Sequence, residues 1–170
     1  MSITITPLAE LHFEQVHAVL DIVARERRYL ALFEAPPREE AFAFYRGLVA
    51  DGQCHVALEQ TTLVGWCDIQ GVFGHARKHI GVLGIGLLPA FRHRGIGAQL
   101  LSAAISTAWS RGLQRIELTV REDNANAKAL YERFGFRHEG IARQSMLVAG
   151  RYYDCHSMAL LRSPAEAGPP

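Results

Sequence analysis

The spacing of apolar positions divides the first half of the chain into strands and amphipathic helices. Alternation over 2–6 predicts a first strand, and apolar residues at helical spacing predict a helix from 8 to about 28. A second helix is expected to begin after Pro36-Pro37 and to stop at Asp51-Gly52. Two apolar runs around a polar turn then favour an antiparallel hairpin, with strands over 55–59 and 63–70.

The second half alternates strands with helices. Its predicted strands cover 80–88, 115–120, 137–148 and 152–161, and its first helix covers 95–111. A later helix is capped by Asp123 or Asn124 and ends at Gly135. Glycines interrupt the strand 80–88, which indicates a bulge, a close approach of another group, or simply a weak strand. No repeat or linker breaks this order, so we expect one domain over 1–162 and a loose tail over 163–170.

Composition is that of a soluble globular domain, with 49% hydrophobic and 21% charged residues. Eighteen basic and seventeen acidic residues leave a net charge of +1, which argues against nucleic acid or an anionic membrane as a partner. No apolar run approaches the roughly 20 residues of a membrane span, and the N-terminus does not resemble a secretory signal. The chain has three widely spaced cysteines, Cys54, Cys67 and Cys155. An odd number without a disulfide-like spacing predicts reduced thiols and a cytoplasmic location.

No metal site is expected. His75 and His79 are four residues apart, but they flank a basic connection between glycines and lack the glutamate that follows the first histidine in helical zinc motifs. A solvated loop therefore explains them better than a metal site.

A basic turn lies between the glycine-interrupted strand and the following helix. Arg92-His93-Arg94 leads into Gly95-Ile96-Gly97, where the first amides of the helix are free. Free amides, a positive helix end and arginines favour an anion, and the glycines let a pyrophosphate approach the backbone. A nucleotide-hydrolase loop would need Gly-Lys-Ser or Gly-Lys-Thr where the chain has Gly97-Ala98-Gln99, and a dinucleotide fingerprint would need a small residue in place of Leu100.

Two blocks in register resemble the acetyl-CoA motif of the GCN5-related N-acetyltransferase (GNAT) superfamily. The first is Arg92-x-x-Gly95-x-Gly97, after a strand ending Leu87-x-Pro89. The second is Asn124-x-x-Ala127-x-x-Leu130-Tyr131-x-x-x-Gly135-Phe136. The chain is similar to the small bacterial amino-acid, phosphinothricin and ribosomal-protein N-acetyltransferases through Arg115-Ile116-Glu117-Leu118-Thr119-Val120 and Gly150-Arg151-Tyr152-Tyr153-Asp154.

The resemblance covers essentially the whole chain and implies a fold of the α/β (α+β) class. It implies one mixed, mostly antiparallel sheet of about seven strands, flanked by about four helices and splayed between strands four and five. It also implies acetyl-CoA as co-substrate and no metal. Dimerisation is common in such enzymes, which allows a homodimer, although no feature of the sequence specifies one.

The resemblance assigns the acetyl donor to three places. Backbone amides at Ile85, Gly86 and Leu87 would hold the thioester carbonyl. The pyrophosphate would lie on the amides of His93, Arg94, Gly95, Ile96, Gly97 and Ala98, with Arg92 or Arg94 adding charge. Asn124 and Asn126 would contact the cofactor, with Asn124 also a helix cap.

Tyr131 is the expected catalytic residue, because its phenol can donate a hydrogen bond to the departing sulfur. A plain core aromatic would show the same helical spacing. The general base stays open between Glu117, which could act through water, Asp68 and Glu34, although a surface or capping carboxylate is the more usual role for each. The residues expected near the acceptor amine are Phe33, Glu34, Trp66, Asp68 and Tyr153; the aromatic ones could instead be core.

Three functions therefore fit the sequence. The first is acetylation of the primary amine of a small molecule, such as an amino acid, by direct attack on acetyl-CoA. The second is acetylation of a protein N-terminus or lysine. The third is a non-catalytic acetyl-CoA-binding module, against which Tyr131 argues.

Overall fold

The computed structural model describes residues 2–163, so the predicted tail from 164 onward lies outside the described residues. The helices and strands follow the predicted order β-α-α-β-β-β-α-β-α-β-β. They are β1 (Ile3–Pro7), α1 (Phe13–Arg25), α2 (Arg38–Ala50), β2 (Cys54–Glu59), β3 (Thr62–Gly71), β4 (Ile80–Leu87), α3 (Ile96–Ser110), β5 (Arg115–Arg121), α4 (Ala125–Arg133), β6 (Arg137–Val148) and β7 (Arg151–Leu161). Short 3₁₀ turns lie at Glu10–His12, His75–Arg77 and Pro89–Phe91.

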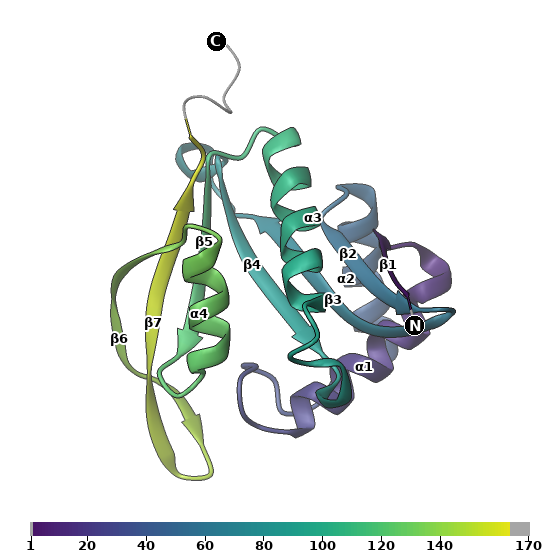
Figure 1. Ribbon diagram of the computed structural model, residues 1–170, viewed down its shortest axis with the longest axis horizontal. Helices are drawn as coiled ribbons and strands as arrows, with labels where there is room; N and C mark the ends of the chain where they lie inside the picture. The colour runs from purple at the N-terminus through teal and green to yellow at the C-terminus, as the bar shows by residue number, and fades with distance from the viewer. Residues whose placement is uncertain (1, 164–170) are drawn as a thin grey trace. The chain divides into compact units, whose positions relative to one another are not determined.

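The strands pair in the order β1-β2-β3-β4-β5-β7-β6 (Figure 1). The pairs β1–β2, β2–β3, β5–β7 and β6–β7 are antiparallel, and β4–β5 is parallel. A mixed, mostly antiparallel sheet of seven strands with four helices is therefore confirmed within the described residues. The chain divides into two compact units, residues 1–70 with 84–107 and residues 71–83 with the chain from Ala108 onward. The division falls within β4 and within α3.

The first unit has helices on both faces of its strands (Figure 1). Helices α1 and α2 bury one apolar cluster against β2 and β3, and it includes Phe13, Val16, Val19, Tyr45, Leu48, Val56 and Trp66. Helix α3 covers the other face, where Thr107 lies 3.4 Å from the ring of the buried His55. The apolar side chains of α3 that this packing buries include Ile96, Leu100, Leu101 and Ala104. Burial of a few such side chains at roughly 1.5–3 kcal/mol each gives the unit its stability.

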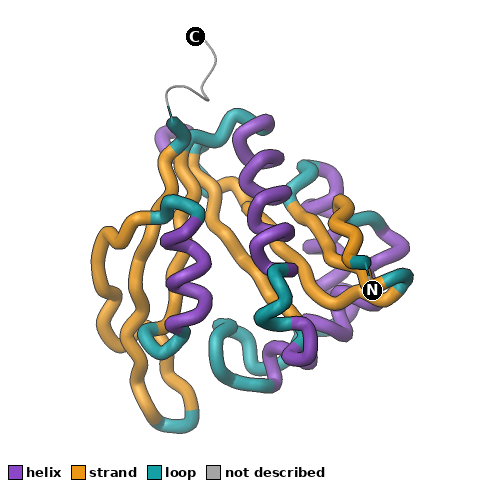
Figure 2. The backbone as a smooth tube through the Cα atoms, viewed as in Figure 1, coloured by secondary structure: helices purple, strands orange, loops and turns teal. Residues whose placement is uncertain are grey.

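The second unit is built on a β6–β7 hairpin, which Figure 2 shows in orange with its turn in teal. β7 also pairs along the whole of β5, from Arg115↔Leu161 to Arg121↔Cys155. The parallel register of β4 with β5 runs from Ile80 to Val82. The predicted splay of β4 from β5 beyond Val82 stays a prediction, because it depends on how the two units are placed.

The three cysteines, Cys54, Cys67 and Cys155, are free and buried. No helix in residues 2–163 has the length and apolar character needed to cross a membrane.

Candidate functional site

Two glycines of β4 leave room for side chains of β3. A Cβ atom at Gly86 would lie 2.2 Å from the ring of Trp66, and one at Gly84 would lie 3.1 Å from Oδ1 of Asp68. The glycines thus mark a close approach, one of the readings the sequence left open. Trp66 belongs to the apolar cluster under α1 and α2 and is 8% exposed, so it packs as a core residue.

The loop between β4 and α3 presents its backbone at the start of a helix. His93 (φ 60°) and Gly95 (φ 77°) both adopt left-handed backbone, and α3 begins at Ile96. The amide of Gln99 donates to the carbonyl of Gly95 (3.2 Å), which closes the first turn. Helix geometry leaves the amides of Ile96, Gly97 and Ala98 without acceptors inside the helix, so they suit an anion.

The two arginines of this loop have different surroundings. Arg92 donates to both carboxylate oxygens of Glu26, at 2.9 and 2.5 Å, and twice to the carbonyl of Leu87, at 3.1 and 2.9 Å. Arg94 is more exposed, with one ion pair to Glu59 at 3.3 Å and its guanidinium over the ring of Phe91. Of the two, Arg94 is the better placed to add charge to a ligand of the loop.

Asp68 is a buried carboxylate, 6% exposed, in the middle of β3. Burial raises its pKa to about 6, although hydrogen bonds from Gln70 (2.6 Å) and Trp66 act in the opposite direction. Tyr45 of α2 is also buried, and its hydroxyl has no hydrogen-bond partner among the described residues. Burial, with smaller contributions from the neighbouring Cys54 and Asp68, raises the pKa of Tyr45 to about 12.

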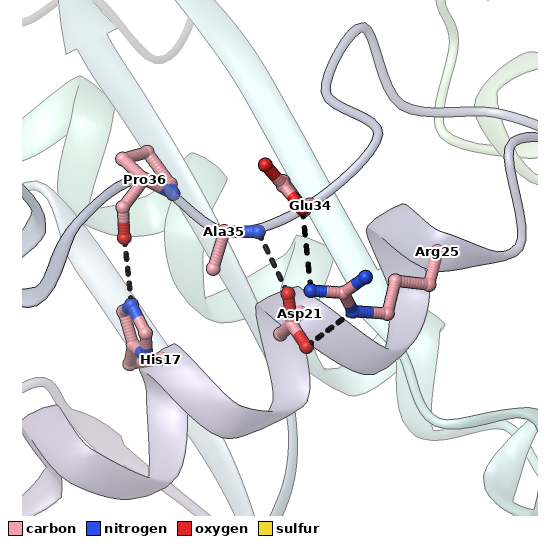
Figure 3. A network of polar contacts seen from close by, with 6 residues as sticks. All are labelled: His17, Asp21, Arg25, Glu34, Ala35 and Pro36. Atoms are coloured by element: carbon pink, nitrogen blue, oxygen red, sulfur yellow. Dashed lines mark hydrogen bonds and ion pairs between the residues drawn. The ribbon is translucent and has the colours of Figure 1, made fainter.

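The loop between α1 and α2 is tied back onto α1 (Figure 3). His17 contacts the carbonyl of Pro36 at 2.8 Å, and Asp21 accepts a hydrogen bond from the amide of Ala35 (2.9 Å). Arg25 donates to Asp21 at 2.7 Å and to Glu34 at 3.3 Å. The carboxylate of Glu34 is therefore already paired with a cation.

Phe33, one of the aromatic residues expected at the acceptor, lies in the same loop. The guanidinium of Arg27 lies over its ring, 5.1 Å from the centroid.

In the second unit, α4 begins with a side-chain cap. Asn124 Oδ1 accepts a hydrogen bond from the amide of Ala127 at 3.3 Å, which confirms the predicted cap. Asn126 is exposed on the first turn. Tyr131 lies two turns further along α4 than the cap and is 6% exposed, with its ring 5.8 Å from that of Phe136.

Glu117 of β5 is held by arginines. Arg115 donates to it at 2.7 Å, and Arg77 lies 3.6 Å from its other oxygen. Arg115 in turn pairs with Glu139, and these carboxylates raise its pKa. This network links β5 to the turn at His75–Arg77 and to β6.

Tyr153 of β7 lies between two guanidinium groups. Those of Arg121 and Arg151 are 4.1 and 4.8 Å from its ring centroid. Arg121 is buried and donates to both oxygens of Asp123, at 2.6 and 2.8 Å. The ring of Tyr153 therefore contacts two cations, and its role at the acceptor stays a prediction.

Each unit gathers a separate part of the predicted set. The first unit holds the end of β4, the loop before α3, Trp66 and Asp68; the second holds the start of α4, Tyr131, Glu117 and Tyr153. The residues that the sequence did not single out are Glu26, Tyr45 and Arg121. Arg121 is a charged residue at the end of an apolar strand, and this pattern could have drawn attention to it. No local signal points to Glu26, because its partner Arg92 lies 66 positions away. The described residues contain no cluster of three or more His, Cys, Asp or Glu that could hold a metal ion.

Sequence comparison matches residues 16–136 to the acetyltransferase (GNAT) family. The chain belongs to this family. It is 35% identical over 88 residues to the L-amino acid N-acetyltransferase AaaT of Escherichia coli K12, a match that covers 51% of the chain and 54% of AaaT. It is 40% identical over 76 residues to the [ribosomal protein bS18]-alanine N-acetyltransferase of Salmonella typhimurium, which covers 45% and 51% respectively. The aligned part therefore spans about half the length of these relatives.

Solved structures share the fold of this GNAT chain. It superposes with a TM-score of 0.89 on yncA from Salmonella typhimurium, which was solved with its cofactor acetyl-CoA. The superposition covers 95% of the chain and 94% of yncA at 18% sequence identity, which supports the fold alone.

Proposed function

We propose that this GNAT chain is an acyltransferase that uses acetyl-CoA to acetylate the primary amine of a small molecule, an amino acid or a related amine. The observation that carries the proposal is the loop before α3, where left-handed His93 and Gly95 turn the chain into the first free amides of a helix. This arrangement suits a pyrophosphate, and acetyl-CoA in yncA supports the same class of donor. Membership of the acetyltransferase family supports the reaction type.

The donor's pyrophosphate would lie on the amides of the loop from His93 to Ala98, with Arg94 adding charge. Gly95 is required here because its left-handed backbone strains any residue with a side chain. The backbone of Ile85, Gly86 and Leu87 would bind the thioester end. Asn126 and the cap residue Asn124, at the start of α4, would add polar contacts to the donor.

Acetyl-CoA supplies an activated acetyl group as a thioester. Transfer forms a C–N bond to the amine and breaks the C–S bond, so the amine loses protons and the sulfur needs one. We assign Tyr131 to the sulfur: its phenol donates a hydrogen bond to the departing thiolate. Because the ordinary pKa of a phenol, near 10, exceeds that of a thiol, near 8.5, the hydrogen bond stabilises the thiolate and full proton transfer comes late.

We assign Asp68 to the amine, because it is a buried carboxylate beside the bare Gly84 backbone. An ammonium group gives its proton to a carboxylate more readily when the carboxyl pKa is raised, as it is here. The orphan hydroxyl of Tyr45 supplies a second polar group in the same region. Glu117 and Glu34, the other candidate bases, are both paired with arginines, which favours Asp68.

The class of acceptor is inferred from the negative charge of Asp68 and from the relatives of the chain. Asp68 provides a negative group for an ammonium, and AaaT, at 35% identity, is an L-amino acid N-acetyltransferase. We therefore expect an amino acid or related amine as the acceptor. Phe33, in the loop before α2, would limit its size.

Thiol release from acetyl-CoA tests the proposal. The purified chain is assayed against a panel of amino acids, polyamines and short peptides, and each product is identified by mass. We expect release with at least one amino acid or small amine. Absence of release with every acceptor would instead support the non-catalytic module.

A second candidate is acetylation of a protein N-terminus. The observation that favours it is the 40% identity to the ribosomal-protein alanine N-acetyltransferase. Preference for a peptide with an N-terminal alanine over free alanine, by tenfold or more in kcat/KM, would support this function over the first.

A further inference from the structure

The contacts of Arg92 give this residue a different role from that of a phosphate ligand. Its guanidinium makes two parallel hydrogen bonds to Glu26, and it makes two more to the carbonyl of Leu87. Four of its five N–H groups can be accounted for in this way. The paired carboxylate also neutralises its charge, so little is left for an anion in the loop.

The three residues of this cluster belong to three different parts of the first unit. Glu26 caps the C-terminus of α1, immediately before the left-handed Arg27 turns the chain away from the helix. Leu87 is the last residue of β4. Arg92 follows the Pro89–Phe91 turn and precedes the left-handed His93. The side chain of Arg92 thus connects the loop both to the end of β4, which precedes it, and to the C-terminal end of α1.

The pair is also protected from solvent. The side chains of Arg92 and Glu26 are 25% and 21% exposed, whereas the loop's other ion pair, Arg94–Glu59, has one 3.3 Å contact and a half-exposed guanidinium. Two-pronged arginine–carboxylate pairs fix geometry as well as charge, and screening by salt weakens them less when they are partly buried.

We propose that Glu26 and Arg92 are positioning residues for the acetyl donor: Glu26 orients Arg92, and Arg92 holds the end of β4 and the loop before α3 in the geometry that binds pyrophosphate. This inference rests on the proposed function, because it assumes that the loop binds the donor. It assigns the donor's phosphates to the backbone amides and to Arg94, and it brings Glu26, the C-cap residue that follows α1, into donor binding.

The proposal predicts a specific split of the kinetic constants. Loosening the loop should weaken donor binding, because misplacement of a preformed site costs affinity. The acetyl-transfer step should change little once the site is saturated, because neither residue is assigned to the reacting atoms. A directly bound phosphate ligand would behave differently: removing Glu26 would release Arg92 and leave donor affinity unchanged or improved.

Calorimetric titration of acetyl-CoA into E26Q, R92Q and the double variant E26Q/R92Q tests this. We expect each single variant to raise the Kd about tenfold and the double variant to lose no more than R92Q, because the pair acts as one unit. At saturating donor, kcat should stay within about threefold of the unaltered chain. The matched control is E14Q, at the other end of α1, where Glu14 forms an exposed ion pair with Arg38; its Kd should not change.

Circular dichroism and urea unfolding establish that each variant is folded at the assay temperature, and R92K, which keeps the charge but loses the two-pronged geometry, should resemble R92Q. Equal or tighter binding by E26Q would overturn the inference, and so would losses that multiply to about a hundredfold in the double variant. A fall in kcat with unchanged Kd would also overturn it. Failure of the unaltered chain to bind acetyl-CoA would overturn the proposed function, and this inference with it.

Discussion

Replacement of Asp68 by asparagine should make the folded chain more stable at neutral pH while removing most of its activity. The side chain is buried in β3, where an ionised carboxylate is costly, and the pKa rises from the ordinary 3.8 to about 6. At about 1.4 kcal/mol for each pH unit, this rise corresponds to about 3 kcal/mol of destabilisation by the charged form. Asparagine has nearly the same shape and carries no charge.

The cost depends on pH in a defined direction. Below about pH 4 the carboxyl group is protonated in both folded and unfolded chains, so it costs nothing. Between about 4 and 6 only the unfolded chain ionises, and stability falls as the pH rises. Above 6 both forms are ionised and the penalty stays constant. The stability advantage of D68N should therefore be larger at pH 8 than at pH 4 by about 3 kcal/mol.

Hydrogen bonding reduces the absolute gain. Gln70 and Trp66 donate to the carboxylate, and an asparagine oxygen replaces only part of that acceptor capacity. A lost hydrogen bond costs about 1–1.5 kcal/mol, which leaves a net gain of about 1.5–2 kcal/mol at pH 8. The difference between the two pH values is less sensitive to this loss, because the amide makes the same contacts at both.

Urea unfolding of both proteins at pH 4 and pH 8, followed by far-ultraviolet circular dichroism, measures these free energies. The same preparations are assayed for thiol release, where we expect kcat/KM of D68N to fall about 100-fold or more at pH 7.5. The unaltered enzyme should lose activity as the pH falls through about 6, because protonation removes the base. A change in relative stability below about 1 kcal/mol between the two pH values would refute the assignment of a buried charge. Full activity in D68N would refute the catalytic role.

Three further substitutions separate the roles of the remaining residues. Tyr131→Phe should lower kcat about 10- to 100-fold and leave the Kd for acetyl-CoA within about threefold, and unchanged turnover would remove Tyr131 from the mechanism. Glu117→Gln should change kcat by less than about threefold, because Arg115 and Arg77 already pair with Glu117; a loss as large as that of D68N would make Glu117 the base. Gly86→Ala should destabilise the chain by about 1–3 kcal/mol through overlap with Trp66, measured as a urea midpoint, and a wild-type midpoint would contradict that packing.

Local signals account for the part of the fold that the sequence predicted. The alternation and helical spacing gave the order of helices and strands, with boundaries within one or two residues for most of them. Asn124 as a cap and Gly135, with φ 89° after α4, follow from rules that involve only neighbouring residues. The first helix was predicted too long, because residues 10–12 form a 3₁₀ turn before α1 and the left-handed Arg27 stops it.

Contacts between distant positions account for what the sequence did not reveal. Apolar alternation cannot tell whether Trp66 lines a pocket or fills the core, and the choice depends on the bare backbone of Gly86, which is 20 positions away. The pairing of Arg92 with Glu26 joins positions 66 apart. A surface carboxylate and a buried one also look alike in sequence, so Asp68, Glu34 and Glu117 could be ranked only when their burial and partners were known.

The donor site was easier to predict from the sequence than the acceptor site, because the two substrates would be bound in different ways. The proposed donor site uses backbone amides, and the backbone is shaped by glycines, caps and helix starts, which are local in sequence. The proposed acceptor contacts use side-chain charge, and the value of each charge depends on partners from other elements. Arg25 pairs with Glu34, whereas Asp68 is buried and has only uncharged hydrogen-bond donors. A search for the acceptor should therefore vary the charge and size of the amine first, because Asp68 is the carboxylate whose charge is not already matched by an arginine among the three candidates.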